Sequence, residues 1–243
     1  MNLEVKLKCR VGPERVAVHG ILDVYTETWA FIVKLNYRVS LYSRHVLPRL
    51  INFAMSQEEI TRLRAAHVPA AYGVVLEVGI GSGLNLPFYA AGVTKVVGVD
   101  PSRELLTMAL QRAAAAPFSV ELLQREATGL PLPDNSVDNA VMTWSLCSIS
   151  DPAATLGEIR RLLKPDGSLI FVEHGLSPDA AVRKWQNHLT PVWRHVAGGC
   201  HLNRNVEHLI LAAGFVMTEL ETGYIRGPRP ATYMYRGLAT KEQ

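Results

Sequence analysis

Short apolar runs that alternate with amphipathic segments are the feature that most constrains the fold of this chain. From Val74 onward, five apolar runs of strand length recur: VVLEV, VTKVVGV, FSVELL, DNAVMTW and SLIFVEH. Segments with helical spacing, such as SRELLTMALQRAAAA and DPAATLGEIRRLLK, separate them. Because strands that alternate with helices form a parallel sheet, the sequence predicts an α/β fold with a doubly wound, mostly parallel sheet.

Capping residues and turn signals predict where these helices and strands begin and end. Ser102 and Asp151 can cap the helices that they precede, and Pro152 suits a first helical position. The segment KPDG at 164–167 is predicted to be a turn. Downstream, RNVEHLILAAGF predicts a helix that ends at Gly214, and the runs FVMTELE and ATYMYRGLA add two strands, which makes seven.

The two remaining segments lack this alternation. Residues 1–73 are predicted to be a helical lead-in, and residues 74–243 the main α/β domain. Residues 178–203, rich in Trp, His and Gly, interrupt the alternation after the fifth strand. We expect them to form a helical insertion that serves as a lid over a substrate.

Composition narrows the class of protein. A chain of 243 residues with 48% hydrophobic residues can bury one sizeable core. The 25 basic and 22 acidic residues are too balanced for an electrostatic nucleic-acid surface, so we expect no nucleic-acid partner. Three cysteines, far apart, predict no disulfide framework, which favours the cytoplasm. The sequence leaves the oligomeric state open.

The most apolar stretch, residues 26–55, is not expected to span a bilayer, because Lys34, Arg38, Arg44 and Arg49 interrupt it. Its mixture of aromatic and basic residues is typical of an amphipathic helix packed on the domain. A helix of this kind can also lie on a membrane surface, so peripheral membrane contact stays an alternative.

The motif with the clearest chemistry is VLEVGIGSGLNLPFY at 75–89: an apolar strand, then Gly79, Gly81 and Gly83, then a predicted helix. Glycines at these points allow a tight turn and let a ligand approach backbone amides. A dinucleotide fingerprint would need Gly or Ala at position 84, where this chain has Leu84. The glycines instead follow Glu77 at every second residue, in a pattern that resembles the first motif of class I methyltransferases.

Two further motifs complete the predicted cofactor site. Asp100 ends the second strand, 21 residues after Gly79, where a carboxylate can accept hydrogen bonds from a ribose diol. The segment REATGLPLPDNSVDNAVMTW resembles a later signature of the same enzymes. That resemblance implies adenine recognition by the Glu126 carboxylate and the Ala127 backbone, although many relatives have Asp at the position of Glu126. The predicted cofactor-binding residues also include Glu77, Asn85 and Trp144 within these motifs and Pro101 after Asp100.

Together these motifs resemble the ubiquinone-biosynthesis-like superfamily of class I methyltransferases, which implies S-adenosylmethionine as cofactor. The branch of alkyl thiol methyltransferases and their soluble bacterial relatives is the most similar. That similarity rests on Leu146-Cys147-Ser148, Glu173-His174 and the block from Trp193 to Cys200, followed by Leu202 and Arg204. The mammalian members have an N-terminal membrane anchor that we do not find here, and an Asp at the position of Gly198.

The resemblance implies methyl transfer to a small-molecule acceptor, for which we expect the sulfur of an apolar thiol or sulfide. His174, at the carboxyl end of the fifth strand, is the leading catalytic candidate; His195 and His201 in the insertion are the others. We also considered His195, Cys200 and His201 as zinc ligands. Their spacing matches no paired-ligand pattern, so we expect no metal site.

The alternatives cover other acceptors and another class of protein. O-, N- or C-methylation of a quinone, phospholipid or secondary metabolite is the main enzymatic alternative. A dinucleotide oxidoreductase is disfavoured by the glycine spacing. A non-catalytic nucleotide-binding interaction protein is the remaining hypothesis.

Overall fold

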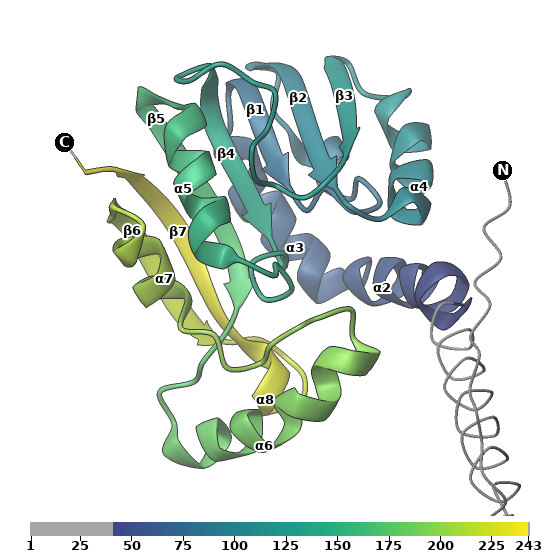
Figure 1. Cartoon of the computed structure of the whole chain (residues 1–243), viewed down its shortest axis with the longest axis vertical. Coiled ribbons are helices and arrows are strands. Elements are labelled where there is room, and N and C mark those ends of the chain that lie inside the picture. Colours follow the sequence, from purple (N-terminus) through teal and green to yellow (C-terminus); the bar gives the residue numbers. More distant parts are fainter. Residues whose placement is uncertain (1–40, 243) are drawn as a thin grey trace, which may run out of the picture. The chain divides into compact units, whose positions relative to one another are not determined.

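The computed structural model describes residues 41–242 and contains a seven-stranded sheet in this part of the chain (Figure 1). The strands are β1 (Gly73–Val78), β2 (Val93–Asp100), β3 (Ser119–Gln124), β4 (Val137–Thr143), β5 (Leu163–His174), β6 (Phe215–Tyr224) and β7 (Tyr233–Lys241). Their spatial order is β3-β2-β1-β4-β5-β7-β6. All seven correspond to apolar runs from which strands were predicted.

The sheet is mixed, which corrects the expectation of a mostly parallel one. The pairs β2–β3, β1–β2, β1–β4 and β4–β5 are parallel, whereas β7 pairs antiparallel with both β5 and β6. The reason is the short connection between β6 and β7, which makes them a hairpin, so β7 enters the sheet beside β5 in the reverse direction.

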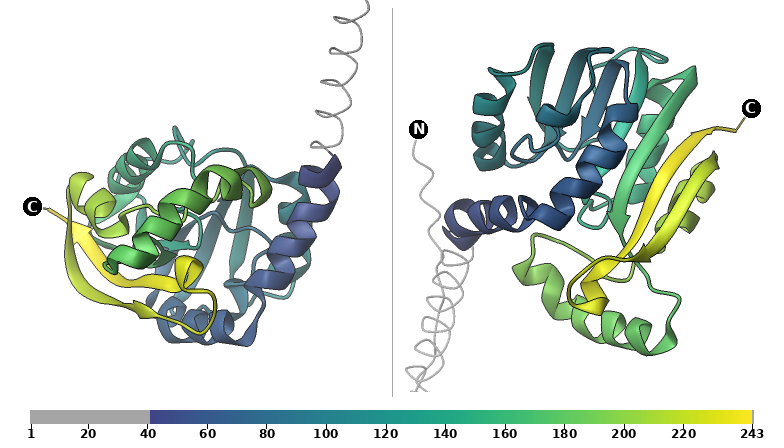
Figure 2. Two further views of the ribbon diagram at one scale, coloured as in Figure 1. Left: turned by 90° about the horizontal axis from the view of Figure 1, so that it is seen from below. Right: turned by 180° about the vertical axis from the view of Figure 1, so that it is seen from behind.

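Helices cover both faces of the sheet (Figures 1 and 2). The described helices are η1 (Tyr42–Val46), α2 (Leu47–Met55), α3 (Glu58–His67), η2 (Val68–Ala70), η3 (Leu86–Phe88), α4 (Arg103–Ala113), α5 (Pro152–Leu162), α6 (Ala180–Val196), α7 (Val206–Ala212) and α8 (Arg229–Thr232). Two predicted caps are confirmed: Ser102 accepts the N–H of Leu105, and Asp151 accepts that of Ala154.

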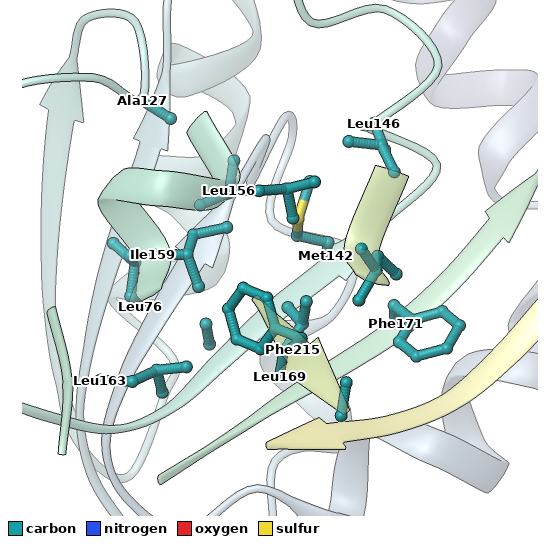
Figure 3. Packing of buried hydrophobic residues seen from close by; sticks show 14 of the residues in the cluster. Leu76, Ala127, Met142, Leu146, Leu156, Ile159, Leu163, Leu169, Phe171 and Phe215 are labelled. Carbon is teal, nitrogen blue, oxygen red and sulfur yellow. The ribbon is translucent and has the colours of Figure 1, made fainter. Parts of the chain in front are cut away.

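The strands alternate their side chains between two packed layers. On the face covered by α5 and α7, residues from both helices and the strands form the larger cluster, centred on Met142, Leu156, Ile159 and Phe171 (Figure 3). On the other face, Val75, Val141 and Ile170 pack against residues from η2, η3 and α4. Burial on both faces explains why the central strands are apolar without interruption.

Two local predictions are corrected. The KPDG segment is not a separate turn but lies within β5, because Val137 pairs with Leu163 and Asn139 with Ser168, so the residues between them form a bulge. The glycine loop is followed by turns and the short 3-10 helix η3 rather than an α-helix. Gly83 has a φ of +78°, outside the helical region, so a regular α-helix does not begin within the loop.

The described part of the lead-in, from η1 to η2, is helical, whereas residues 1–40 lie outside the described part and the boundary at residue 73 stays a prediction. Of the predicted insertion, residues 180–196 form α6, which lies beyond the carboxyl ends of the parallel strands (Figure 1). Between residues 41 and 242, no helix combines the length and the apolar character needed to cross a membrane.

Candidate active site

The glycine loop begins where β1 ends, and all three glycines adopt the left-handed conformation. Gly79, Gly81 and Gly83 have φ values of +72°, +54° and +78°. A Cβ added to Gly79 would lie 2.4 Å from the Cβ of Ser145, so this glycine allows the loop to contact the chain after β4. A Cβ on Gly81 would meet only the Gly79 carbonyl oxygen, at 3.9 Å. Gly81 therefore faces open space, as the approach of a ligand requires.

Asp100, at the tip of β2, holds this loop in place. Its Oδ2 accepts the backbone N–H of Gly81 at 3.0 Å, and its Oδ1 accepts that of Ser102 at 2.8 Å. Burial raises the pKa of Asp100; the two backbone hydrogen bonds oppose the rise, and the negative charge of Glu126 adds to it. Each carboxylate oxygen retains a lone pair for a further donor, so the carboxylate can still accept from a diol.

Glu77 lies beneath the loop and both of its oxygens are occupied by protein donors. The amide of Asn85 donates to Oε1 at 2.9 Å, and the hydroxyl of Tyr89 donates to Oε2 at 2.8 Å. Burial raises the pKa of Glu77 to about 7 against the effect of these hydrogen bonds. Glu77 and Asn85 thus brace the loop from below, a role that the sequence pattern did not distinguish from direct cofactor contact.

Arg64 on α3 is a residue of this site that the sequence did not predict. Its Nε donates to the side-chain Oδ1 of Asn85 at 2.9 Å, and its guanidinium lies over the Trp144 ring, 4.9 Å from the ring centroid. Burial lowers the pKa of Arg64 to about 10, so the side chain stays charged at neutral pH. The lead-in therefore contributes to the cofactor loop, and no motif marked this arginine in advance.

The predicted adenine pair lies at the same edge of the sheet. Glu126 is exposed and Ala127 is buried, and both follow Gln124, the residue of β3 that pairs with Asp100 of β2. Pro101 is exposed directly after Asp100, and Trp144 is partly buried with a φ of +51°. Glu77, Asp100 and Trp144 end or follow β1, β2 and β4, so the fold brings the predicted cofactor residues together.

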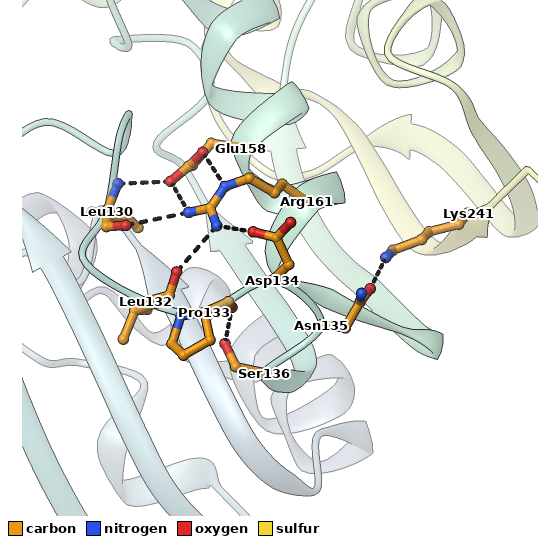
Figure 4. Close-up of polar contacts among 9 residues, drawn as sticks. All are labelled: Leu130, Leu132, Pro133, Asp134, Asn135, Ser136, Glu158, Arg161 and Lys241. Carbon is orange, nitrogen blue, oxygen red and sulfur yellow. Dashed lines mark hydrogen bonds and ion pairs between the residues drawn. The ribbon is translucent and has the colours of Figure 1, made fainter.

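The turn that follows the adenine pair is held by one arginine (Figure 4). Arg161 on α5 bonds the carboxylate of Glu158, the carboxylate of Asp134 and the carbonyl oxygens of Leu130 and Leu132. Asp134 of this motif therefore has a structural role in the turn, together with Glu158 on α5.

The structure brings together three ligand-type side chains that are far apart in the sequence. Cys147 lies in the turn after β4, His174 ends β5, and Cys200 follows α6. Their ligand atoms all lie within 4.8 Å of one another, with 3.2 Å between His174 Nε2 and Cys200 Sγ. Only Cys200 belongs to the zinc set that we considered from spacing, and we refer to these three residues as the Cys-His-Cys cluster.

Backbone contacts fix the two cysteines beside each other. The N–H of His201 donates to the Cys147 carbonyl oxygen at 2.9 Å, and the N–H of Cys200 donates to that of Ala197 at 3.2 Å. Gly198 and Gly199, with φ values of +62° and +86°, form the tight turn that returns the chain from α6 to the sheet. A Cβ on Gly199 would lie 3.2 Å from the Ser148 carbonyl oxygen, which shows how closely the segments approach.

The other two catalytic candidates lie outside the cluster. His195 is exposed on α6, and its Nδ1 contacts the Pro191 carbonyl oxygen at 2.8 Å. His201 is partly buried, with its Nδ1 3.3 Å from the Cys147 carbonyl oxygen and 3.4 Å from a nitrogen of Arg204. His201 thus borders the cluster through its backbone, whereas His195 faces solvent.

Comparisons with known proteins agree with this geometry. A methyltransferase domain family matches residues 76–171, which contain the glycine loop, Asp100 and the adenine pair. The phosphatidylethanolamine N-methyltransferase of Cereibacter sphaeroides is 35% identical over 55% of this chain and 68% of its own length. The chain belongs to the class I S-adenosylmethionine-dependent methyltransferases.

Two further relatives refine the comparison. The thiol S-methyltransferase TMT1B of Rattus norvegicus is 36% identical to this methyltransferase over 60% of the chain, and the match spans 62% of the rat protein. A S-adenosylmethionine-dependent methyltransferase from Thermotoga maritima has the same fold, with a TM-score of 0.57 and 20% identity over 82% of this chain and 99% of its own.

The site residues fit the cofactor of this family. The space in front of Gly81 is one that a Cβ would fill, and Asp100 and Glu126 offer carboxylate oxygens along one edge. When bound, S-adenosylmethionine supplies a methyl group on a positively charged sulfur. The chain would hold it with the loop amides, Asp100 and residues 126–127, while Arg64, Glu77 and Asn85 keep the loop in position.

Charge in the Cys-His-Cys cluster is shared among buried groups. A hydrogen bond from Cys200 and the charge of His174 lower the pKa of Cys147 well below its ordinary value, against burial. Burial alone would lower the pKa of His174, but the negative charge of Cys147 outweighs it and raises that pKa. Burial raises the pKa of the neighbouring Glu173 to about 8, and the Cys147 charge adds to the rise. This corner of the methyltransferase therefore favours a negatively charged sulfur.

Proposed function

We propose that this chain transfers a methyl group from S-adenosylmethionine to the sulfur of a small apolar thiol. The assignment of the cofactor is supported by the glycine loop and by the contact of Asp100 with it. The assignment of the acceptor is supported by the Cys-His-Cys cluster, which lies at the carboxyl ends of β4 and β5 next to the loop. The similarity to a thiol S-methyltransferase supports it as well. One observation carries the proposal. Ser145 packs against Gly79 of the glycine loop and lies two residues before Cys147 in the chain, so the predicted cofactor loop and the cluster are close together.

Methyl transfer requires that the protein align the two reacting atoms and favour the ionised nucleophile. A lone pair of the acceptor sulfur forms a bond to the methyl carbon, the bond from that carbon to the sulfonium sulfur breaks, and the thiol proton leaves to solvent. Alignment of the two reacting atoms at about 3–3.5 Å supplies most of the acceleration. Because a thiol has a pKa of about 8.5, a site that favours the thiolate raises the reactive fraction near neutrality.

The residues around the acceptor have separate tasks in this proposal. Glu173 accepts the N–H groups of Ser145 and Leu146 on Oε1, at 2.9 and 3.0 Å, and so holds the turn after β4 against β5. His174 lies at the end of the same strand, with its Nε2 3.2 Å from Cys200 Sγ, and would favour the ionised form of the acceptor thiol. Helix α6, with Trp185, Leu189 and Trp193 exposed along its length, would act as the lid over an apolar acceptor.

N-methylation of a phospholipid amine is the second candidate function. The relative from Cereibacter sphaeroides favours it, and so do the exposed apolar side chains of Leu50 and Phe53 on α2. These side chains lie in the described part of the segment for which peripheral membrane contact was an alternative. The similarity to the thiol S-methyltransferase of Rattus norvegicus extends over a larger share of this chain, 60% against 55%, and supports the thiol as the first candidate.

A panel assay with isotope-labelled cofactor tests the proposal. The full chain is incubated with thiols, phenols, amines and vesicles that contain phosphatidylethanolamine, and labelled products are identified by mass spectrometry. The proposal expects label in a thioether. Label only in a lipid amine or in an oxygen ether would replace it with the corresponding alternative, and cofactor binding without any labelled product would favour a binding protein.

A further inference from the structure

The Cys-His-Cys cluster has the dimensions of a metal site. Zinc binds thiolate sulfur at about 2.3 Å and imidazole nitrogen at about 2.0–2.1 Å, so the ligand atoms of a tetrahedral site lie about 3.5–3.8 Å apart. The ligand atoms of Cys147, His174 and Cys200 all lie within 4.8 Å of one another, and the closest distance between His174 and Cys200 is 3.2 Å. Side-chain shifts of less than about 1 Å would therefore complete the geometry.

The three side chains are largely buried, and a divalent cation would offset the cost of burying negatively charged sulfur. Cys147 and His174 are 4% and 7% exposed, and Cys200 is partly buried. Two thiolates and one neutral imidazole around a divalent cation carry no net charge, which removes the cost of a buried anionic sulfur. The second ring nitrogen of His174, Nδ1, is buried and has no hydrogen-bond partner among the described residues. Among the described residues, the ring therefore has its hydrogen-bond contacts with the sulfur atoms of the cluster.

We infer that Cys147, His174 and Cys200 bind a thiophilic divalent cation of the zinc type, with an open fourth position for the acceptor thiol. Sulfur and imidazole ligands favour zinc over magnesium and calcium, which prefer oxygen. Within the described residues the group contains three Cys or His side chains and no fourth Cys, His, Asp or Glu. Structural zinc sites are closed by four protein ligands, whereas catalytic sites have three and leave one position open.

The position of the cluster identifies the fourth ligand, and this step rests on the proposed function. Cys147 follows Ser145, which contacts the cofactor loop at Gly79, and the Glu173 carboxylate binds this turn to β5 beside His174. A thiol that enters the open position loses its proton to solvent and binds as a thiolate. Its sulfur then lies on the side of the sheet where the methyl donor is held, and the methyl transfer balances as written above.

The same two cysteines could instead form a disulfide, which is a distinct outcome. Disulfide formation would need an oxidant and would remove two ligands from the ion. Experiment distinguishes the two states. Bound zinc displaces the thiol protons, leaves both sulfur atoms reduced and protects them from oxidation and alkylation, whereas a disulfide contains oxidised sulfur.

The first experiment measures metal content. The full chain is purified under reducing conditions, exposed to Zn²⁺, desalted and analysed by inductively coupled plasma mass spectrometry. We expect about one zinc ion per chain. Cys147→Ser and His174→Ala should each lose most of it, whereas His208→Ala, which removes an exposed histidine from α7, should retain it. Equal zinc content in all four proteins, or none in the wild type, would overturn the inference.

A second measurement does not depend on variants that fold. Wild-type protein loaded with Co²⁺ should show thiolate-to-cobalt charge-transfer absorption and the visible bands of a tetrahedral ion. Addition of a small thiol without cofactor should shift these bands, because the thiol occupies the open position. An absent thiolate band overturns the metal site, and an unchanged spectrum with thiol overturns the open position. A mass two hydrogen atoms lower in the peptides that contain Cys147 and Cys200, restored when a reductant is added, identifies a disulfide instead.

The two proposals can fail separately. Thiol methylation at an equal rate by chelator-treated and zinc-loaded protein would leave the proposed function intact and overturn the role of the ion. If the protein binds zinc and thiol but transfers label only to amines, the metal site is supported and the proposed thiol methylation is overturned.

Discussion

The carboxylate of Asp100, at the tip of β2, accepts the backbone N–H of Gly81 at 3.0 Å. This bond joins two adjacent parallel strands through their carboxyl ends, where ligands of open α/β sheets bind. The residue predicted to hold the ribose therefore also positions the loop that is predicted to bind the rest of the cofactor.

Replacing Asp100 with Ala should weaken binding of S-adenosylmethionine and leave the fold intact. A hydrogen bond to a charged group contributes about 1.5–3 kcal/mol, which corresponds to a loss of about 10- to 150-fold in affinity. Isothermal titration calorimetry with S-adenosylhomocysteine measures it. Asp166→Ala, an exposed carboxylate in the β5 bulge, is the matched control and should bind as the wild type does. Unchanged affinity in the Asp100 variant would remove this residue from the site.

Replacing Gly81 with Val should abolish cofactor binding, because the branched side chain would occupy the space in front of the loop amides. The φ of +54° adds strain, so Gly81→Ala is the milder variant in which the fold is expected to persist. Gly214→Ala provides the control, since Gly214 has a φ of +79° and lies after α7. Calorimetry should show lost affinity at position 81 only. Normal binding by a folded Gly81 variant would mean that the ligand does not approach this loop.

The buried carboxyl of Glu77 should make stability fall as the pH rises. Its pKa is raised to about 7 in the folded chain, against about 4.3 unfolded, so the folded state binds more protons between these values. Stability from this group is therefore full below about pH 4.3 and is lost progressively up to about pH 7. Glu77→Gln removes the titration.

Urea unfolding at pH 5 and pH 8 tests this linkage. The free energy of unfolding of Glu77→Gln minus that of the wild type should increase by about 2–3 kcal/mol between the two pH values. Glu207→Gln, at an exposed position on α7, should show no such change. A difference that is independent of pH would show that Glu77 has an ordinary pKa.

Arg64 should be required for the packing of α2 and α3 on the cofactor loop. Arg64→Ala removes the bond to Asn85, a bond to the Met55 carbonyl oxygen and the contact with Trp144. Hydrogen exchange of the amides in residues 47–67 should accelerate, and cofactor affinity should fall. Arg62→Ala, which removes only exposed ion pairs on the same helix, should change neither. Equal exchange in both variants would restrict Arg64 to a local contact.

His174 should matter most for thiols that are poorly ionised. His174→Ala should lower turnover with an alkyl thiol of high pKa far more than with an acidic aryl thiol that is already ionised at the assay pH. Assistance to ionisation is typically worth about 10²–10⁴-fold, so the contrast should be visible in kcat/KM. His208→Ala is the control. An equal loss for both thiols, with cofactor affinity retained, would assign His174 to positioning of the acceptor.

Local patterns in the sequence were enough to predict the strands, the helix caps and the glycine loop. Ser102, Asp151 and the glycines at 79, 81 and 83 act through hydrogen bonds and dihedral angles within a few residues, so their roles can be inferred without knowledge of the rest of the chain. Asp100 was predictable for a related reason, since the length of one strand-helix-strand unit fixes its distance from the loop.

Direction within the sheet was not predictable in this way. Apolar periodicity describes which face of a strand is buried and is the same for parallel and antiparallel neighbours, so the reversed β7 did not show in the sequence. The KPDG bulge in β5 also depends on the partner strand, because Val137 and Asn139 determine where the ladder resumes.

The family, the cofactor motifs and the order of the elements were predictable because each depends on residues that are neighbours along the chain. The contact of Arg64 with Asn85 and the meeting of Cys147, His174 and Cys200 became apparent in the three-dimensional fold alone. Their spacing in the chain carries no metal-ligand pattern, since each ligand comes from a different segment. Parallel strands bring their carboxyl ends to one edge, and the turn at Gly198 and Gly199 returns Cys200 to that edge, which is why distant residues form one cluster.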